Sequence, residues 1–144
     1  MVSGSFDILS HIMEIYFSEP NEDNVSDDIS EALMRSVIRN LRAAIQNPQD
    51  YTARSNLMWA ATMAENRIVK LGKRMDFECH QMEHQLGAYT NCNHGEGLPF
   101  CTLSTIATFT NTACRNSSVL QPRFGVLWQT VKQMKKSPLQ VLRR

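Results

Sequence analysis

The sequence predicts an all-α domain with an irregular C-terminal tail. Along the first 98 residues, apolar side chains recur at steps of three and four, the spacing of a helix that buries one face. Proline, glycine and asparagine mark mostly short connections between these stretches. No segment has a convincing strand pattern, and 144 residues are enough for one domain with a single core.

The first predicted helix runs from about Ser5 to Phe17, with Ser3 or Ser5 as its N-cap and Pro20 just beyond its end. Its apolar residues repeat at helical spacing, which predicts one buried face. They are Phe6, Leu9, Ile12, Met13 and Tyr16.

The second predicted helix has Ser26 as a candidate N-cap, and Asp27 and Asp28 lie where the helix dipole favours carboxylates. It ends at Asn47-Pro48. One apolar face extends over about five turns. This face consists of Ile29, Leu33, Val37, Leu41 and Ile45.

Asp50 is a candidate cap for a third helix that ends at Gly72, and Asp76 for a fourth that reaches about Tyr89. The third helix carries a seam with small residues, which lets another helix approach closely. The seam consists of Leu57, Ala61, Ala64, Ile68 and Leu71.

The character of the chain changes at Pro99. Threonine and serine become frequent, the last residues are basic, and helix caps and apolar periodicity both fade. We therefore divide the chain into a helical domain over residues 1–98 and a tail over residues 99–144.

Composition argues against several classes of partner. A net charge of +1 gives no reason to expect nucleic acid or an anionic membrane, and no apolar run approaches the roughly 20 residues that span a bilayer. The first ten residues carry no lysine or arginine, so they do not resemble a signal peptide. The four cysteines show no C-x-x-C spacing and are expected to be free thiols in a reducing cytoplasm.

All four histidines fall in short stretches that resemble parts of a metal site. Asp7 and His11 are four apart, as are His80 and His84, and each pair would lie on one face of a helix. A loop could bring His94 back over the end of the fourth helix. Imidazoles with one carboxylate suit Fe²⁺ or Zn²⁺ better than Ca²⁺ or Mg²⁺, which prefer oxygen ligands.

Other interpretations of these residues remain open at this point. An Asp and a His four apart can be a surface pair, and H-x-x-x-H is often structural. Cys79 and Cys92 could join His80 and His94 in a structural zinc site, although their spacing matches no common zinc-finger pattern.

Four stretches in order resemble the iron-containing alcohol dehydrogenase family, in particular its butanol-dehydrogenase-like branch. They are FDILSHIMEIYF from residue 6, NP with YTARSNLMWAAT from residue 47, HQMEHQLGA from residue 80 and HGEGL from residue 94. Together they span most of residues 6–98, so the resemblance is specific although each stretch alone is weak.

The resemblance implies the helical metal-binding half of a two-domain dehydrogenase. It implies a divalent metal, Fe(II) or Zn(II), held by Asp7, His11, His80 and His94, and a place for His84 near the substrate and nicotinamide. In the family the metal polarises an alcohol or aldehyde oxygen while hydride passes to or from NAD(P), and members are often homo-oligomers. The family's dinucleotide-binding domain has no counterpart in this sequence, so we expect a fragment that is inactive alone.

The tail departs from this resemblance. Back-translated with permissive codons and read one nucleotide earlier, residues 99–144 can give AVLYPVYYRHIYKHGLPKFVRF and further on ADGKTDEEIAIAG, which look like the family's continuation. We therefore expect that one base is lost after Leu98 and that the tail is out of frame. The alternatives are a non-catalytic helical metal-binding or interaction protein, and a helical fragment with no ligand.

Overall fold

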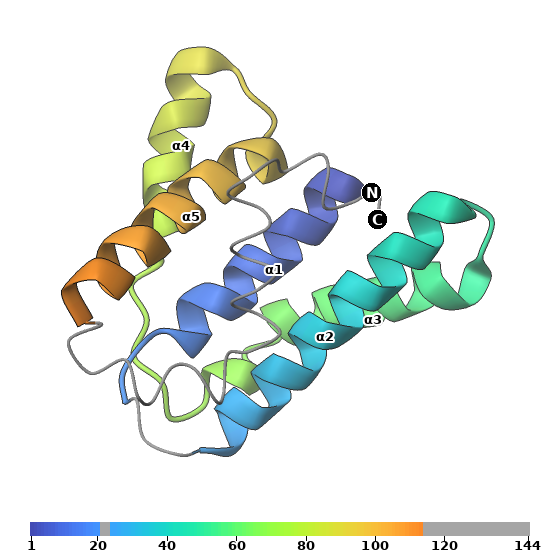
Figure 1. Cartoon of the computed structure of the whole chain (residues 1–144), viewed down its shortest axis with the longest axis horizontal. Helices are drawn as coiled ribbons and strands as arrows, with labels where there is room; N and C mark the ends of the chain where they lie inside the picture. The colour runs from blue at the N-terminus through green and yellow to red at the C-terminus, as the bar shows by residue number, and fades with distance from the viewer. Residues whose placement is uncertain (21–23, 114–144) are drawn as a thin grey trace. The chain divides into compact units, whose positions relative to one another are not determined.

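The computed structural model describes residues 1–20 and 24–113, and this part of the chain is helical, as predicted (Figure 1). The only β-type pairing among these residues is an isolated bridge between Glu19 and Arg74. The elements are α1 (Val2–Tyr16), α2 (Val25–Gln46), α3 (Tyr51–Glu65), the 3-10 turn η1 (Ile68–Lys70), α4 (Glu78–Thr90) and α5 (His94–Ala113).

The chain divides into two compact units, Met1–Thr102 and Leu103–Arg144. The first contains the helices up to α4 and the beginning of α5. Of the second, the described residues are the end of α5. The division falls four residues after the predicted boundary at residue 98.

The core of the first unit lies where α2 packs against both α1 and α3. Its centre is formed by large side chains that are fully buried, and helical spacing explains why they share a side of their helices. They are Ile12 and Ile15 of α1, Met34 and Val37 of α2, and Val69 of η1. This packing gives α1 the rigid support on which the site described below depends.

Two of the predicted N-caps are wrong. Helix α1 begins at Val2 with Met1 as its cap residue, so Ser3 and Ser5 lie inside the helix. Helix α2 is capped by Asn24, whose side chain accepts a hydrogen bond from the Asp27 amide. Asn24 can act as the N-cap because it adopts the extended conformation required of a cap residue, whereas Ser26 is already in the helix.

The third helix is shorter than predicted. It ends at Glu65, because Arg67 adopts a left-handed conformation with φ 70° and breaks the helical path. The apolar seam therefore stops early, and Ile68 and Leu71 are exposed. Asp50 caps the helix as predicted, accepting from the Ala53 amide at 3.0 Å.

Helix α4 begins after Phe77, which is the cap residue in a left-handed conformation. The carboxylate of Asp76 nevertheless accepts from the Glu78 amide at 3.1 Å, so it satisfies one of the free donors at the helix start. The helix ends at Thr90, one residue beyond the predicted end.

The predicted irregular tail is wrong for residues 99–113, because α5 continues through Pro99 to Ala113. Proline removes a single hydrogen bond, to the carbonyl four residues earlier, which here belongs to a glycine. Leu98 and Thr102 are both buried on either side of it, and the Thr102 hydroxyl lies 3.2 Å from that of Ser10. The rest of the tail, residues 114–144, lies outside the described residues.

None of the helices in the described ranges combines the length and the apolar character needed to cross a membrane.

Candidate metal centre

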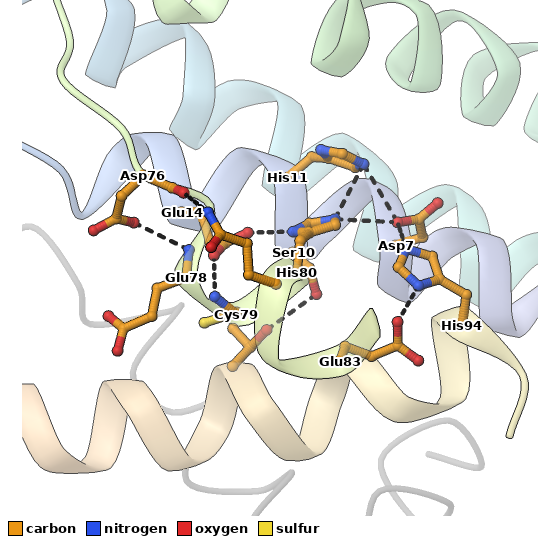
Figure 2. A network of polar contacts seen from close by, with 12 residues as sticks. Asp7, Ser10, His11, Glu14, Asp76, Glu78, Cys79, His80, Glu83 and His94 are labelled. Carbon is orange, nitrogen blue, oxygen red and sulfur yellow. Dashed lines mark hydrogen bonds and ion pairs between the residues drawn. The ribbon is translucent and has the colours of Figure 1, made fainter. Parts of the chain in front are cut away.

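Helix α1 carries three ionisable side chains along one face. Asp7, His11 and Glu14 follow each other at steps of four and three, so they lie one above another along the helix. Figure 2 shows all three gathered around His80 of α4, which each of them contacts.

The other side chains come from α4 and α5. His80 lies in the first turn of α4 and is buried. Asn91 ends α4 in a left-handed conformation, and the short connection after it places His94 as the first residue of α5. The close approach of α5 to α1 requires Gly95, because a Cβ atom there would clash with the backbone carbonyl of Ser3.

Four donor atoms converge from these three helices. Asp7 Oδ1 lies 3.4 Å from His11 Nε2 and 3.5 Å from the Nε2 atoms of both His80 and His94. The Nε2 atoms of His11 and His80 are 3.2 Å apart. Ligand atoms held tetrahedrally around Zn²⁺ or a similar ion lie ~3.4 Å from one another. The separations of Asp7 from the three imidazoles, and of His11 from His80, are therefore those expected between ligands of one ion.

The carboxylate at the centre of this group is an orphan in the structure. Asp7 Oδ1 is buried and accepts no hydrogen bond from the part of the chain that the structure describes, although three imidazoles surround it. Buried polar atoms without a partner are rare and call for an explanation. A cation bound by Asp7 and the imidazoles would provide one.

The pKa values of the neighbouring imidazoles of His11 and His80 are shifted in opposite directions. Burial lowers the pKa of His11, and the nearby His80 lowers it further. Burial also acts to lower the pKa of His80, but the carboxylates of Asp7 and Glu14 outweigh it and raise that pKa to about 9. The His80 imidazole in turn lowers the pKa of Asp7. Such opposed shifts are typical of functional sites.

His11 has a second partner. Its Nε2 lies 2.8 Å from a carboxylate oxygen of Glu65, at the end of α3. Asp7, His80 and His94 can place their donor atoms within 4.8 Å of one another, whereas His11 is not part of that set. In this conformation Glu65 therefore competes for the nitrogen through which His11 would bind an ion.

His84 lies apart from the three convergent imidazoles. It is exposed on α4, and its ring centroid is 5.3 Å from that of His94. Glu83, His84 and His94 form a second group that could hold a cation, but its His94 is shared with the first. The position of His84 at the solvent side of the centre is compatible with a substrate-facing role.

The structural zinc alternative finds no support in the geometry. The groups of potential metal ligands found among residues 1–20 and 24–113 contain no cysteine. The amide of Cys79 donates to Glu14, and the Cys92 thiol lies 3.8 Å from Glu83.

Sequence reasoning missed three carboxylates that contact the imidazoles: Glu14, Glu65 and Glu83. Two of them could have been recognised from their spacing to the candidate ligands. Glu14 continues the face of Asp7 and His11, and Glu83 follows His80 by three residues on the same helix. For Glu65 the sequence held no signal, because its approach depends on how α3 packs.

Comparison with known proteins decides the family. The model of the Fe-containing alcohol dehydrogenase family, C-terminal, matches residues 1–142. The chain belongs to this family. Among curated relatives, NADH-dependent butanol dehydrogenase A of Clostridium acetobutylicum is 44% identical over 100 residues, which are 69% of this chain and 26% of the relative.

Solved structures of the same family share the fold. An NADH-dependent butanol dehydrogenase A from Thermotoga maritima matches with a TM-score of 0.65 and 38% identity, covering 68% of this chain and 25% of that one. The aldehyde reductase YqhD from E. coli matches with a TM-score of 0.72 and 28% identity, covering 77% and 29%.

The chain thus spans about a quarter of the length of the curated relatives it matches. The family model matches beyond Leu98, whereas the alignments with the butanol dehydrogenase A of Clostridium and with the E. coli reductase cover 100 and 98 residues. A change of reading frame after Leu98 therefore stays a prediction.

Proposed function

We propose that this chain is the metal-holding part of an NAD(P)-linked alcohol dehydrogenase, in which Asp7, His11, His80 and His94 bind Fe(II) or Zn(II). The observation that carries the proposal is that Asp7 Oδ1 lies 3.4 to 3.5 Å from the Nε2 atoms of His11, His80 and His94, which come from α1, α4 and α5. Membership of the family and the names of the relatives supply the substrate class, an alcohol or aldehyde.

A bound divalent ion supplies Lewis acidity toward the oxygen of the alcohol or aldehyde. The chain's own residues hold it in place: α1 provides one carboxylate and one imidazole, and α4 and α5 provide one imidazole each. To bind, His11 must release Glu65, which is half exposed and free to move into water.

His84 is proposed to act on the substrate side. Its exposed ring lies beside that of His94, so it can reach a proton of a substrate positioned at the open side of the centre. An exposed histidine at that place can exchange the proton with water.

The test of the metal site is the metal content of the purified chain. We expect about one equivalent of Fe or Zn by mass spectrometry, and its loss in His80→Ala. Gln85→Ala is the matched control, because Gln85 is exposed on the same helix and outside the ligand set. Absence of metal in the wild-type chain after reconstitution with Fe²⁺ or Zn²⁺ would contradict the proposal.

The chain alone is proposed to be inactive with butanol or butanal and NAD(P), because the residues that bind the nicotinamide in the family belong to the part of the relatives that it does not match. A chimera tests the catalytic role. Residues 1–98 replace the matching segment of the Clostridium butanol dehydrogenase A, which is 44% identical over 100 residues. We expect NADH-dependent reduction of butanal, abolished by His80→Ala. A chimera that binds metal without turnover would favour the alternative, a non-catalytic helical metal-binding protein.

We also propose a reading-frame change, a cellular location and an oligomeric state for this protein. Residues 99–144 are proposed to be out of frame, and resequencing independent clones tests this: an intact frame without a nearby insertion or deletion contradicts a sequence error. We place the protein in the cytoplasm, in keeping with the free thiols of Cys92 and Cys101. A homo-oligomer is expected by analogy with the family, and its mass in solution tests it.

A further inference from the structure

The most exposed imidazole of the centre, that of His94, contacts a buried carboxylate. His94 Nδ1 contacts Oε2 of Glu83, the residue that separates the ligand His80 from His84 on α4 (Figure 2). The Glu83 side chain is almost completely buried, whereas that of His94 is 41% exposed. Packing alone therefore does little to fix the ring of His94.

Space for this carboxylate is created by two glycines. A Cβ atom at Gly97 would lie 2.6 Å from Glu83 Oε1 and 2.9 Å from its Cγ, and one at Gly87 would lie 3.4 Å from Oε1. Gly97 belongs to the same helical turn as His94, so the glycine that admits Glu83 lies beside the imidazole that Glu83 contacts. The chain thus builds a fitted site for this side chain.

Among the described side chains, those of residues 1–20 and 24–105, His94 is the only ion-pair partner of Glu83. An ionised carboxylate buried without a partner costs several kcal/mol, so this pairing matters for the folded state. A carboxylate can only accept hydrogen bonds, so the Nδ1 of His94 must carry the proton. In the neutral imidazole the Nε2 atom, which lies 3.5 Å from Asp7 Oδ1, is then left with its lone pair.

The same arrangement recurs at His80. Its Nδ1 contacts Oε2 of Glu14, and the other oxygen of Glu14 accepts from the Cys79 amide at 2.5 Å. His11 differs, because its Nδ1 is buried and has no hydrogen-bond partner among the residues that the structure describes. Two of the three imidazoles are therefore oriented by a buried carboxylate.

We propose that Glu83 is a positioning residue that holds His94 in the Nδ1-protonated tautomer with Nε2 toward the metal, and that Glu14 does the same for His80. The inference rests on the proposed metal site. Carboxylates that accept from the second nitrogen of a ligand histidine fix its ring, and their loss typically weakens metal binding about 10–100-fold.

Glu83 offers the cleaner test, because Glu14 also binds the backbone of α4. Glu83→Leu keeps the volume and removes the acceptor, whereas Glu83→Gln keeps an amide oxygen that can accept from Nδ1. We expect Zn²⁺ affinity, measured against a competing chelator, to fall about 10–100-fold in Glu83→Leu and substantially less in Glu83→Gln. Gln85→Ala serves as the control variant on α4.

A second readout needs no metal. Nitrogen NMR of the metal-free wild-type chain, in mildly alkaline buffer, should show His94 protonated on Nδ1, and Glu83→Leu should move the proton to Nε2. Unchanged Zn²⁺ affinity in a folded Glu83→Leu chain, or a wild-type His94 protonated on Nε2, would overturn the inference. A wild-type chain that binds no Zn²⁺ would instead overturn the proposed function. If Glu83→Leu does not fold, the tautomer of His94 in the wild-type chain still tests whether Glu83 positions this ring.

Discussion

A single glycine determines whether the carboxylate of Glu83 fits beneath α5. In Gly97→Ala the new Cβ atom would lie 2.6 Å from Glu83 Oε1, and the buried carboxylate has little room to move. We expect a loss of about 1–3 kcal/mol in the free energy of unfolding, as for other overpacked sites. Thermal or urea unfolding of the metal-free chain measures it.

Gly4→Ala provides the matched control. Gly4 lies in α1, and a Cβ atom there would meet nothing within 4 Å. Alanine favours a helix interior by roughly 0.5–1 kcal/mol over glycine, so this variant should be slightly more stable than the wild type. Equal stability of the two variants would show that the fit around Glu83 is not tight.

At the residue scale, spacing alone could group the candidate ligands but could not orient them. Two residues four apart predict a shared face, which holds for Asp7 with His11. For His80 and His84 it does not say which imidazole turns inward, because that depends on how α4 lies against α1. The family resemblance favoured His80, and the structure buries His80 and exposes His84. Their spacing places Glu14 and Glu83 on the same helix faces as the candidate ligands, but only the packing of the helices shows that their carboxylates contact the imidazoles.

Helix starts can be predicted where a side chain reaches back to the backbone. Asp50 caps α3 by accepting from the Ala53 amide at 3.0 Å. Asp50→Ala should lower the free energy of unfolding by about 1 kcal/mol, because a backbone donor loses its acceptor. Urea unfolding measures the change. Gln49→Ala, an exposed substitution just before the helix, should be neutral, and a comparable loss there would argue against a capping effect.

A buried lysine joins the end of α1 to the start of α2. Lys73 Nζ lies 3.0 Å from Asp27 Oδ1 and donates to the carbonyls of Pro20 and Tyr16 at 2.9 and 3.3 Å. Its side chain is 1% exposed, so Lys73→Met leaves a largely buried carboxylate without its cation. We expect a loss of about 3 kcal/mol, measured by chemical unfolding.

The exposed pair of Arg35 with Glu31, 3.1 Å apart on α2, is the control. Arg35→Met should change stability by less than about 0.5 kcal/mol, because water screens the pair. If both variants lose the same amount, burial of the Lys73 pair is not the reason for its effect.

Helix ends were harder to predict than helix interiors, for physical reasons that Arg67 and Pro99 illustrate. Arg67 ends the third helix by adopting φ 70°, a conformation that is rare for arginine. The residue type therefore gives no sign of it in the sequence. Pro99 was expected to end regular structure, yet α5 continues through it because Leu98 and Thr102 are buried on the core side. At Pro99, tertiary packing outweighs local preference. Apolar spacing, by contrast, predicts much of the buried faces of α1 and α2, although the fully buried Ile15 and Met34 lie outside the predicted sets.

At the scale of the whole first unit, the candidate metal centre joins parts of the structure that pack in different ways. Helices α1, α2 and α3 share the apolar core, with fully buried side chains such as Ile12 and Val37. Around the centre, α4 and α5 face α1 through polar side chains, among them His80 and His94. A bound ion would therefore link α4 and α5 to the helical core.

Removal of the ion should loosen α4 and the start of α5 more than the rest of the unit. Binding to the folded state stabilises it by about 2.7 kcal/mol when the free ion is at 100 times its Kd, and this stabilisation is lost with a chelator. Hydrogen exchange of the Zn²⁺-loaded and chelated chains should differ mainly in α4 (Glu78–Thr90) and in the first turn of α5. Little change is expected in α2 and α3, whose protection comes from apolar packing. Asp7→Ala with Zn²⁺ present should exchange like the chelated wild type. If chelation changes exchange equally in all helices, or in none, the ion does not link α4 to α1.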